Sequence, residues 1–320
     1  MIKEFKTRTG AIFCDTEKRL EWLYVGDYGK NANIKANFLG LTKEINGVEH
    51  HPVNLEDKMV VTISTQKGCP MKCRFCDCPG VKFGGNATFP EMAMEIYEAI
   101  KSSGCKHTKR FNLHLARMGE PSFNYGNVKQ LLNWLPQIVE TGMSADVIHP
   151  VFTTMMPKNN SNIDNILLDF CLIKNQWYYG EAGLQLSINS TDDAQRDWFF
   201  DGRSMSLGGI SRTCEMLPMP IGRKYTLNFP VTKDTILNPA VLDNLFDKDK
   251  FIVKITPIHA TKEAEINHIE TTQGYSDYDV YRKFEQPLLE HGWDVIVFVP
   301  SVAEDEDRIT CGNALLSQMR

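Results

Sequence analysis

The sequence has no long hydrophobic run and no excess of positive charge. No stretch approaches the apolar length that a membrane-spanning helix needs, and residues 1–6 contain no apolar core of signal-peptide length. The 35 Lys and Arg are outnumbered by 40 Asp and Glu, which gives a net charge of −5. Non-specific nucleic-acid binders are normally basic, so any contact with RNA must come from a local patch. We expect no membrane partner.

What the chain does have is cysteine, with nine residues of this type. Without a secretory signal, this number predicts a protein of the reducing cytoplasm, where clustered thiols serve metal binding or catalysis more often than disulfides. At 320 residues and 42% hydrophobic content, the chain is long enough for one large α/β domain with a full core.

Three of the cysteines, Cys69, Cys73 and Cys76, are spaced C-x3-C-x2-C on a Gly-rich loop. Three thiolates can hold three irons of a [4Fe–4S] cluster and leave the fourth iron open. An open iron can chelate the amine and carboxylate of S-adenosylmethionine (SAM), and the reduced cluster can pass an electron into the sulfonium. The aromatic Phe75, just before the last cysteine, is the usual companion of this motif. The spacing therefore predicts a radical SAM cluster.

Cys78 leaves a second interpretation open. With Cys69, Cys73 and Cys76 it could complete four ligands for a structural zinc or for a closed electron-transfer cluster. Zinc sites, however, usually come as two separated C-x2-C pairs, and here all four thiols fall within one ten-residue loop. This favours the open cluster.

From Met59 onward, strand and helix patterns alternate, as a parallel sheet or barrel requires. A capping box at Thr88–Glu91 predicts a helix that begins there. We predict an α/β fold, a partial (βα)6 radical SAM barrel whose site lies at the carboxyl ends of the strands. We predict a small β-rich cap over residues 1–58, the barrel over 59–300 and a carboxyl-terminal tail over 301–320. The predicted strands are 59–65, 110–116, 145–154, 183–188, 225–229, 251–257 and 293–299, and the predicted helices include 88–102, 164–174, 208–216, 239–246 and 278–291.

Several segments, in order along the chain, resemble motifs of the RlmN/Cfr family of radical SAM methylases, which act on adenosine in RNA. The resemblance runs from about Val48 to Leu315. The cluster loop is similar to the family's "GC…CxFC", and the carboxyl-terminal Cys311-Gly312 is similar to its "ACGQL". Three further segments match in order: Met118-Gly119-Glu120-Pro121 resembles "MGEP", Ser187-Ile188-Asn189-Ser190 stands where the family has "SLHA", and residues 256–260 resemble "IPxNP".

The resemblance implies a role for each matched position. Cys311 would be the cysteine that is methylated during turnover, and Glu49 would be the proton acceptor. The implied cofactors are a [4Fe–4S] cluster and SAM. The implied partners are an RNA substrate (rRNA or tRNA) and a flavodoxin- or ferredoxin-type reductant. The implied SAM contacts are Gly119, Glu120, Thr153, Ser187, Asn189 and His259.

The chain departs from the family pattern in three ways. Thr62 stands where the family has its second catalytic cysteine, seven residues before the first cluster cysteine. The "SLHA" histidine is Asn189 here, and the "IPxNP" asparagine is His259. The 68 residues before Cys69 leave little room for the family's helical RNA-recognition domain.

These departures keep three functional hypotheses open. In the first, Cys311 takes a methyl group from one SAM and a radical from a second SAM activates it for transfer to an sp² carbon. Cys78, or more weakly Cys14 or Cys105, then replaces the missing cysteine. In the second, the chain performs non-methylating radical chemistry on a nucleotide, a peptide or another small substrate. In the third, it is a non-catalytic metal- or RNA-binding module.

Overall fold

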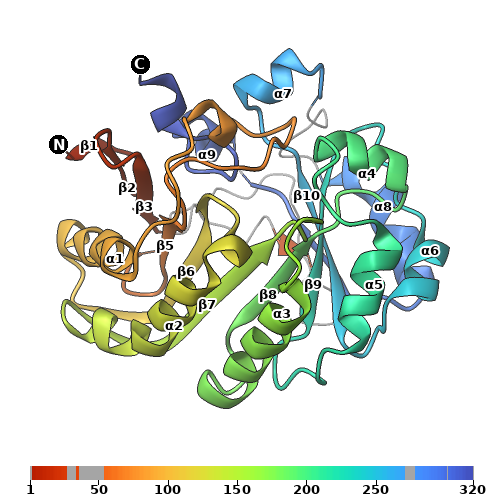
Figure 1. The fold of residues 1–320 in the computed structure, drawn as a ribbon, viewed down its shortest axis with the longest axis horizontal. Coiled ribbons are helices and arrows are strands. Elements are labelled where there is room, and N and C mark those ends of the chain that lie inside the picture. The colour runs from red at the N-terminus through yellow and green to blue at the C-terminus, as the bar shows by residue number, and fades with distance from the viewer. Residues whose placement is uncertain (1, 27–33, 36–53, 271–277, 301, 320) are drawn as a thin grey trace.

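Parallel strands dominate the structure, a computed structural model that describes residues 2–26, 34–35, 54–270, 278–300 and 302–319 (Figure 1). Within these residues the strands form one sheet, in the order β1-β2-β3-β5-β6-β7-β8-β9-β10-β11-β4. The strands from β5 to β11 pair in parallel, and β1, β2 and β3 extend the sheet with antiparallel pairing. The strand bounds are β1 Ile2–Lys6, β2 Gly10–Asp15, β3 Leu20–Val25, β4 Ile34–Lys35, β5 Met59–Ser64, β6 His107–Met118, β7 Ser144–Thr154, β8 Gly183–Ser187, β9 Tyr225–Val231, β10 Phe251–Pro257 and β11 Val295–Phe298.

Helices connect the parallel strands, so that six βα units precede the last parallel strand, β11. Figure 1 shows α1, α2 and α3 along the outer side of the curved sheet. The α/β fold with a partial barrel is therefore confirmed. The helix bounds are α1 Phe89–Ser103, α2 Tyr125–Glu140, α3 Ile163–Leu172, α4 Asp193–Phe199, α5 Leu207–Glu215, α6 Pro239–Leu245, α7 Lys262–Ile266, α8 Asp279–Glu290 and α9 Val302–Glu306.

Helix α1 illustrates how local sequence sets an element. The Thr88 hydroxyl accepts a hydrogen bond from the Glu91 N–H at 3.3 Å, and the Glu91 carboxylate accepts one from the Thr88 N–H at 2.9 Å. This is the predicted capping box, which satisfies two backbone donors that a helix start leaves open. Gly104 ends the helix with φ 67°, a conformation that glycine adopts without steric cost.

The first strands join the barrel directly, because Leu23 of β3 pairs with Thr62 of β5. All six residues of β3 are buried. The amino and carboxyl ends of the described chain lie near each other, beside this edge of the sheet (Figure 1). None of the helices in the described ranges is long and apolar enough to cross a membrane.

Candidate functional site

A cavity of about 330 Å³ lies at the carboxyl ends of the parallel strands. Several strands contribute residues that are two apart, such as Val151 and Thr153 of β7 or Gln185 and Ser187 of β8, because alternate side chains of a strand face the same side. Nine of the predicted site residues line it: Cys69, Cys73, Cys76, Gly119, Glu120, Thr153, Ser187, His259 and Cys311. Glu49, the predicted proton acceptor, lies outside the described residues.

The three-cysteine loop is fixed by aromatic packing and backbone hydrogen bonds. The ring of Phe75 packs edge-on against Phe199 and Phe200, with centroid distances of 5.9 and 5.8 Å. The Phe75 carbonyl accepts a hydrogen bond from the Thr261 hydroxyl at 3.0 Å, and the Asp77 N–H donates to the Gly312 carbonyl at 2.8 Å. These contacts tie the loop to α4, to the start of α7 and to the carboxyl-terminal tail, so the loop is held before any metal binds.

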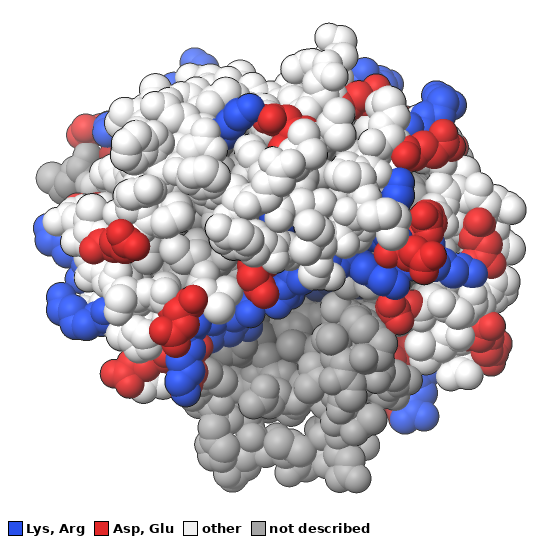
Figure 2. All heavy atoms as spheres, turned by 90° about the horizontal axis from the view of Figure 1, so that it is seen from below, with Lys and Arg blue, Asp and Glu red and all other residues white. Residues whose placement is uncertain are grey.

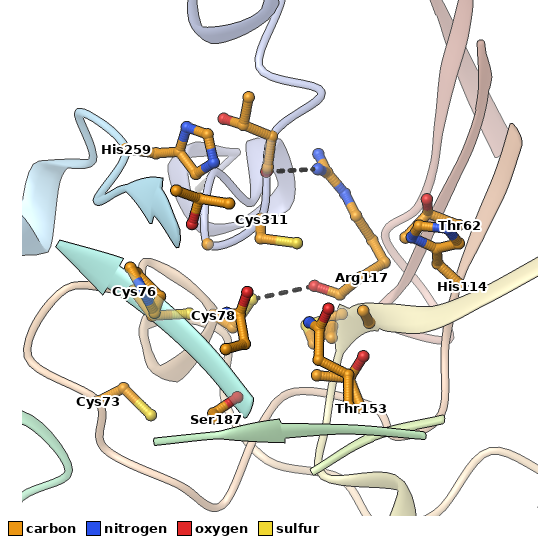
Figure 3. A pocket seen from close by; sticks show the side chains of 18 of the residues that line it. Thr62, Cys73, Cys76, Cys78, His114, Arg117, Thr153, Ser187, His259 and Cys311 are labelled. Atoms are coloured by element: carbon orange, nitrogen blue, oxygen red, sulfur yellow. Dashed lines mark hydrogen bonds between the residues drawn. The ribbon is translucent and has the colours of Figure 1, made fainter. Parts of the chain in front are cut away.

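Cys78 is oriented differently from the other three thiols. It is 3% exposed, and its Sγ donates to the Arg117 carbonyl at 3.2 Å, as the lower dashed line of Figure 3 marks. The thiol also makes a hydrogen bond with Cys76, and this bond is the main reason why the pKa of Cys76 lies below its ordinary value. A thiol carries one proton, so Cys78 donates to only one of these two acceptors at a time.

Burial dominates the electrostatics of the other two loop cysteines. It raises the pKa of Cys69 to about 12 and also raises that of Cys73, and the neighbouring Cys76 adds to both shifts. Iron binding must therefore displace protons from these thiols, as thiolate ligation requires. Three soft sulfur donors facing one cavity match what an iron–sulfur cluster needs. In the described ranges, no three His, Cys, Asp or Glu side chains are grouped to hold a single metal ion.

Gly119 and Glu120 form a tight turn where β6 ends. Gly119 has φ +107°, and a Cβ there would lie 2.8 Å from side-chain atoms of Gln66 and Thr65, so a residue with a side chain would not fit. The Glu120 carboxylate is 3% exposed and accepts the N–H groups of Ser122 at 3.1 Å and Met155 at 3.0 Å. Burial raises the pKa of Glu120. The side chain of Thr154 is a further hydrogen-bond partner of this carboxylate, so an ammonium group in the cavity would share its acceptor sites with these protein donors.

Among the predicted SAM contacts in the described ranges, Asn189 alone lies outside the cavity lining. It is fully buried, with φ 63° and no hydrogen-bond partner for either side-chain atom in the described part of the chain. This positive φ turns the chain just after β8, and the preceding Ser187 faces the cavity instead (Figure 3). Its predicted contact with SAM stays a prediction.

The sequence interpretation missed three polar residues deeper in the cavity, Gln185, Asn228 and Lys254. Lys254 Nζ lies 3.5 Å from Gln185 Oε1, and the buried Asn228 Oδ1 has no partner among the described residues. An orphaned buried acceptor is costly unless a ligand or water satisfies it, so it indicates a polar ligand. The signal in the sequence that could have revealed Asn228 is its position as a polar residue in the buried stretch of the parallel strand β9.

The tail brings Cys311 to the same cavity. Cys311 is exposed, and Figure 3 shows its Sγ directed into the space between Arg117 and the cluster loop. His259, after β10, lies on the same side of the cavity, with Nδ1 3.0 Å from Asp305 Oδ1. Thr62, at the position of the family's second cysteine, lines the opposite side. The cavity thus combines the three thiols of the cluster loop, a buried carboxylate and a separate exposed thiol.

Comparisons with known proteins agree with this arrangement. No family model matches the chain. A probable dual-specificity RNA methyltransferase RlmN of Heliobacterium modesticaldum is 24% identical over 210 residues, which is 64% of this chain and 51% of that protein. Its counterpart from Chlorobium phaeobacteroides is 30% identical over 238 residues, 67% of this chain and 61% of that protein. The chain spans about half the length of the curated relatives it matches.

Solved structures show the same fold. A radical SAM methyltransferase from Sphaerobacter thermophilus superposes with a TM-score of 0.64 at 16% identity, over 99% of this chain and 81% of that chain. Streptococcus suis SuiB bound to S-adenosylmethionine superposes with a TM-score of 0.50 at 13% identity, over 77% of this chain and 51% of that chain. At such identities the likeness concerns the fold alone.

Proposed function

Because the chain is a divergent member of the RlmN/Cfr family of radical SAM methylases, we propose that it is a methyltransferase that uses Cys311 as methyl carrier. The observation that carries this proposal is that Cys311 and the three loop cysteines, far apart in the sequence, line one cavity. When bound, a [4Fe–4S] cluster and SAM would supply the methyl group and a 5′-deoxyadenosyl radical.

The residues of this chain would hold and orient these groups. Cys69, Cys73 and Cys76 would ligate the cluster. Glu120 would accept hydrogen bonds from the SAM ammonium, which is a charge-assisted contact in a buried site. The backbone of Gly119 and the side chains of Thr153, Ser187 and His259 are the further proposed SAM contacts, and Asn228 adds a buried acceptor.

Cys311 would serve as the nucleophile that accepts a methyl group, since the thiolate is the reactive form of cysteine. Its exposure to the cavity, in contrast to the buried Cys105 and Cys214, favours this role. Among the candidate replacements for the missing cysteine, Cys78 lines the cavity, whereas Cys14 and Cys105 do not. Cys78 is therefore the proposed resolving thiol, and Glu49 stays the proposed proton acceptor.

The proposed acceptor is an sp² carbon of an adenosine in RNA, because the curated relatives are named RNA methyltransferases. On the face shown in Figure 2, Lys and Arg are interspersed with Asp and Glu, and a short row of basic side chains crosses the middle of the view. Mixed charge of this kind favours a restricted RNA contact over a broad basic surface. A flavodoxin- or ferredoxin-type reductant is the proposed electron donor, and the nine cysteines favour the reducing cytoplasm.

Thr62 supports a second candidate, non-methylating radical chemistry on a nucleotide, a peptide or another small substrate. A hydroxyl at this position cannot form the disulfide through which the family releases its product. The products of SAM distinguish the two candidates. Methylene transfer yields both S-adenosylhomocysteine and 5′-deoxyadenosine, whereas a purely radical reaction yields 5′-deoxyadenosine alone.

The proposal is tested with reconstituted protein, a chemical reductant, SAM and RNA transcripts, with products measured by liquid chromatography and mass spectrometry. We expect Cys73→Ala to abolish SAM cleavage. We expect Cys311→Ala to release 5′-deoxyadenosine but neither S-adenosylhomocysteine nor methylated nucleoside. The matched control is Cys214→Ala, a buried thiol outside the cavity, which should retain all three products. Methylated product from Cys311→Ala would remove Cys311 from the mechanism.

A further inference from the structure

A buried ion pair adjoins the segment that carries Cys311. Arg117 of β6 and Glu21 of β3 have side chains that are 2% and 0% exposed, and Arg117 Nε donates to Glu21 Oε1 at 2.7 Å. A buried pair of this kind gains little net stability, because the desolvation of both charges offsets their attraction. Its value to the protein therefore depends on what the two groups orient.

Both terminal nitrogens of Arg117 reach the tail, and Nη2 also contacts Glu21 Oε1. Nη2 donates to the carbonyls of Arg308 at 3.0 Å and Asn313 at 3.1 Å, and Nη1 reaches the Thr310 carbonyl at 3.4 Å. Figure 3 shows Arg117 extending from the middle of the cavity toward the tail. These carbonyls lie on both sides of Cys311 in the sequence. The rigid fork of a guanidinium thereby fixes the backbone on either side of the thiol.

Glu21 binds the next part of the same segment. Its Oε1 accepts the Leu315 N–H at 3.1 Å, and its Oε2 accepts the Leu316 N–H at 2.5 Å. The two charged groups thus contact five backbone positions between residues 308 and 316. Glu21 itself does not line the cavity, so its effect on the site must pass through the tail or through Arg117, which does line it.

We propose that the Glu21–Arg117 ion pair is a positioning pair that holds Cys311 at its transfer position in the cavity. The functional part of this inference rests on the proposed role of Cys311, whereas the structural part stands on the hydrogen bonds alone. Placement matters because a shift of about 1 Å in a reacting group can cost about 100-fold in rate. Glu21 does not line the cavity, and the guanidinium of Arg117 is hydrogen-bonded to Glu21 and to the tail carbonyls, so we assign both as positioning residues and not as catalytic ones.

The first test is Glu21→Gln, which keeps the shape of the side chain and removes its charge. Hydrogen exchange measured by mass spectrometry on the metal-free protein should show faster exchange, by about tenfold or more, in peptides covering residues 308–319, since charge-assisted bonds to two amides are weakened. The matched control is Lys224→Met, which breaks the half-buried pair with Asp294 outside the cavity. It should leave exchange in this segment unchanged. Unchanged exchange in Glu21→Gln would overturn the proposal, whether or not Cys311 carries a methyl group.

The second readout is the ratio of methylated Cys311 to 5′-deoxyadenosine in the reconstituted enzyme. A merely structural role lowers both quantities together, because fewer molecules fold. A positioning role lowers the ratio, by about tenfold for a displacement of a few tenths of an ångström. An unchanged ratio in Glu21→Gln would overturn the positioning role. A wild-type enzyme that never methylates Cys311 would instead refute the proposed function and leave the hydrogen-exchange result standing.

The double variant Glu21→Met with Arg117→Leu separates stability from positioning. Replacing both buried charges with apolar groups leaves no unpaired charge and is often neutral for stability. We expect the double variant to melt above the single variant Arg117→Leu but to show the same fast exchange over residues 308–319. Wild-type exchange in the double variant would show that the pair positions nothing.

Discussion

Arg196 of α4 offers the sharpest test of how the strand ends are held. The residue is 1% exposed, and its guanidinium donates to four backbone carbonyls and one hydroxyl. Two of the carbonyls belong to Ser187 and Ile188, where β8 ends, and Ser187 lines the cavity. The other acceptors are the carbonyls of Met155 and Met205 and the Ser204 hydroxyl. The guanidinium carbon also lies 4.8 Å from the centroid of the Phe200 ring.

The cost of Arg196→Met can be estimated from these contacts. Met155 O and Ile188 O each keep another donor, from Ser204 and Ser190. The carbonyls of Ser187 and Met205 lose a charged donor, at about 1–3 kcal/mol each for a buried group. Loss of the buried charge offsets part of this cost, because burial disfavours the cation and lowers the pKa of Arg196 to about 9. We expect a net loss of about 3 kcal/mol in the free energy of unfolding, or roughly 5 °C in Tm for a chain of 320 residues.

Arg196→Lys is the informative companion variant. A lysine keeps the charge, but its single ammonium cannot reach acceptors spread around a planar fork. We therefore expect Arg196→Lys to be no more stable than Arg196→Met, and both to weaken SAM binding. The matched control is Arg223→Met, because Arg223 is about half exposed and pairs with Glu181 at 3.5 Å. This change should cost less than about 1 kcal/mol.

Thermal unfolding and SAM titration by calorimetry provide the measurements. Wild-type stability in Arg196→Lys would refute the argument, because it would mean that charge alone, and not the geometry of the fork, supports the strand ends. Weakened SAM binding in the control Arg223→Met would also contradict the claim that the Arg196 fork supports the strand ends.

Three further predictions concern buried groups. Burial lowers the pKa of His149 to about 2, so the folded state stays neutral while the unfolded state takes up a proton below its ordinary pKa of 6.5. Stability should then fall by about 2 kcal/mol between pH 7 and pH 5, as measured by urea unfolding, and His149→Gln should remove this loss. Burial raises the pKa of Glu95 well above its ordinary value, so the folded state retains a proton that the unfolded state loses above about pH 4.5. Glu95→Gln should therefore stabilise the protein increasingly from pH 5 to pH 8, and an equal effect at both pH values would contradict the assignment. Gly119→Ala should weaken SAM binding and cost about 2 kcal/mol or more in stability, since φ +107° and two contacts at 2.8 Å oppose a side chain. Wild-type SAM affinity in that variant would contradict the tight turn.

Features set by nearby residues were predictable from the sequence. The capping box of α1 depends on residues three apart, and the observed helix begins at Phe89, as the motif requires. The strand β10 spans Phe251–Pro257, the predicted range, because its β-branched and aromatic residues form one short run that ends at a proline. The cluster loop is a contiguous motif, so its three cysteines could be assigned to one site without knowledge of the fold.

Features that depend on distant contacts were not predictable. Glu21 and Arg117 meet only because β3 joins the edge of the barrel sheet and the tail returns to it, and no local pattern marks this contact. Asn189 was predicted to contact SAM from its position in a motif, and that motif did not indicate its backbone φ of 63° or its place outside the cavity lining. The inward orientation of Asn228 required the register of β9, because a shift of one residue exchanges the two faces of a strand.

The central claim is that Cys311 carries the methyl group, and mass spectrometry of one peptide tests it directly. Protein reconstituted with iron under anaerobic conditions is incubated with reductant and SAM labelled in its methyl group, and then digested with trypsin. Cleavage after Arg308 yields a peptide of residues 309–320 that contains Cys311 as its single cysteine. The account predicts the labelled methyl group on Cys311. An unmodified Cys311 in protein that cleaves SAM to 5′-deoxyadenosine would contradict it.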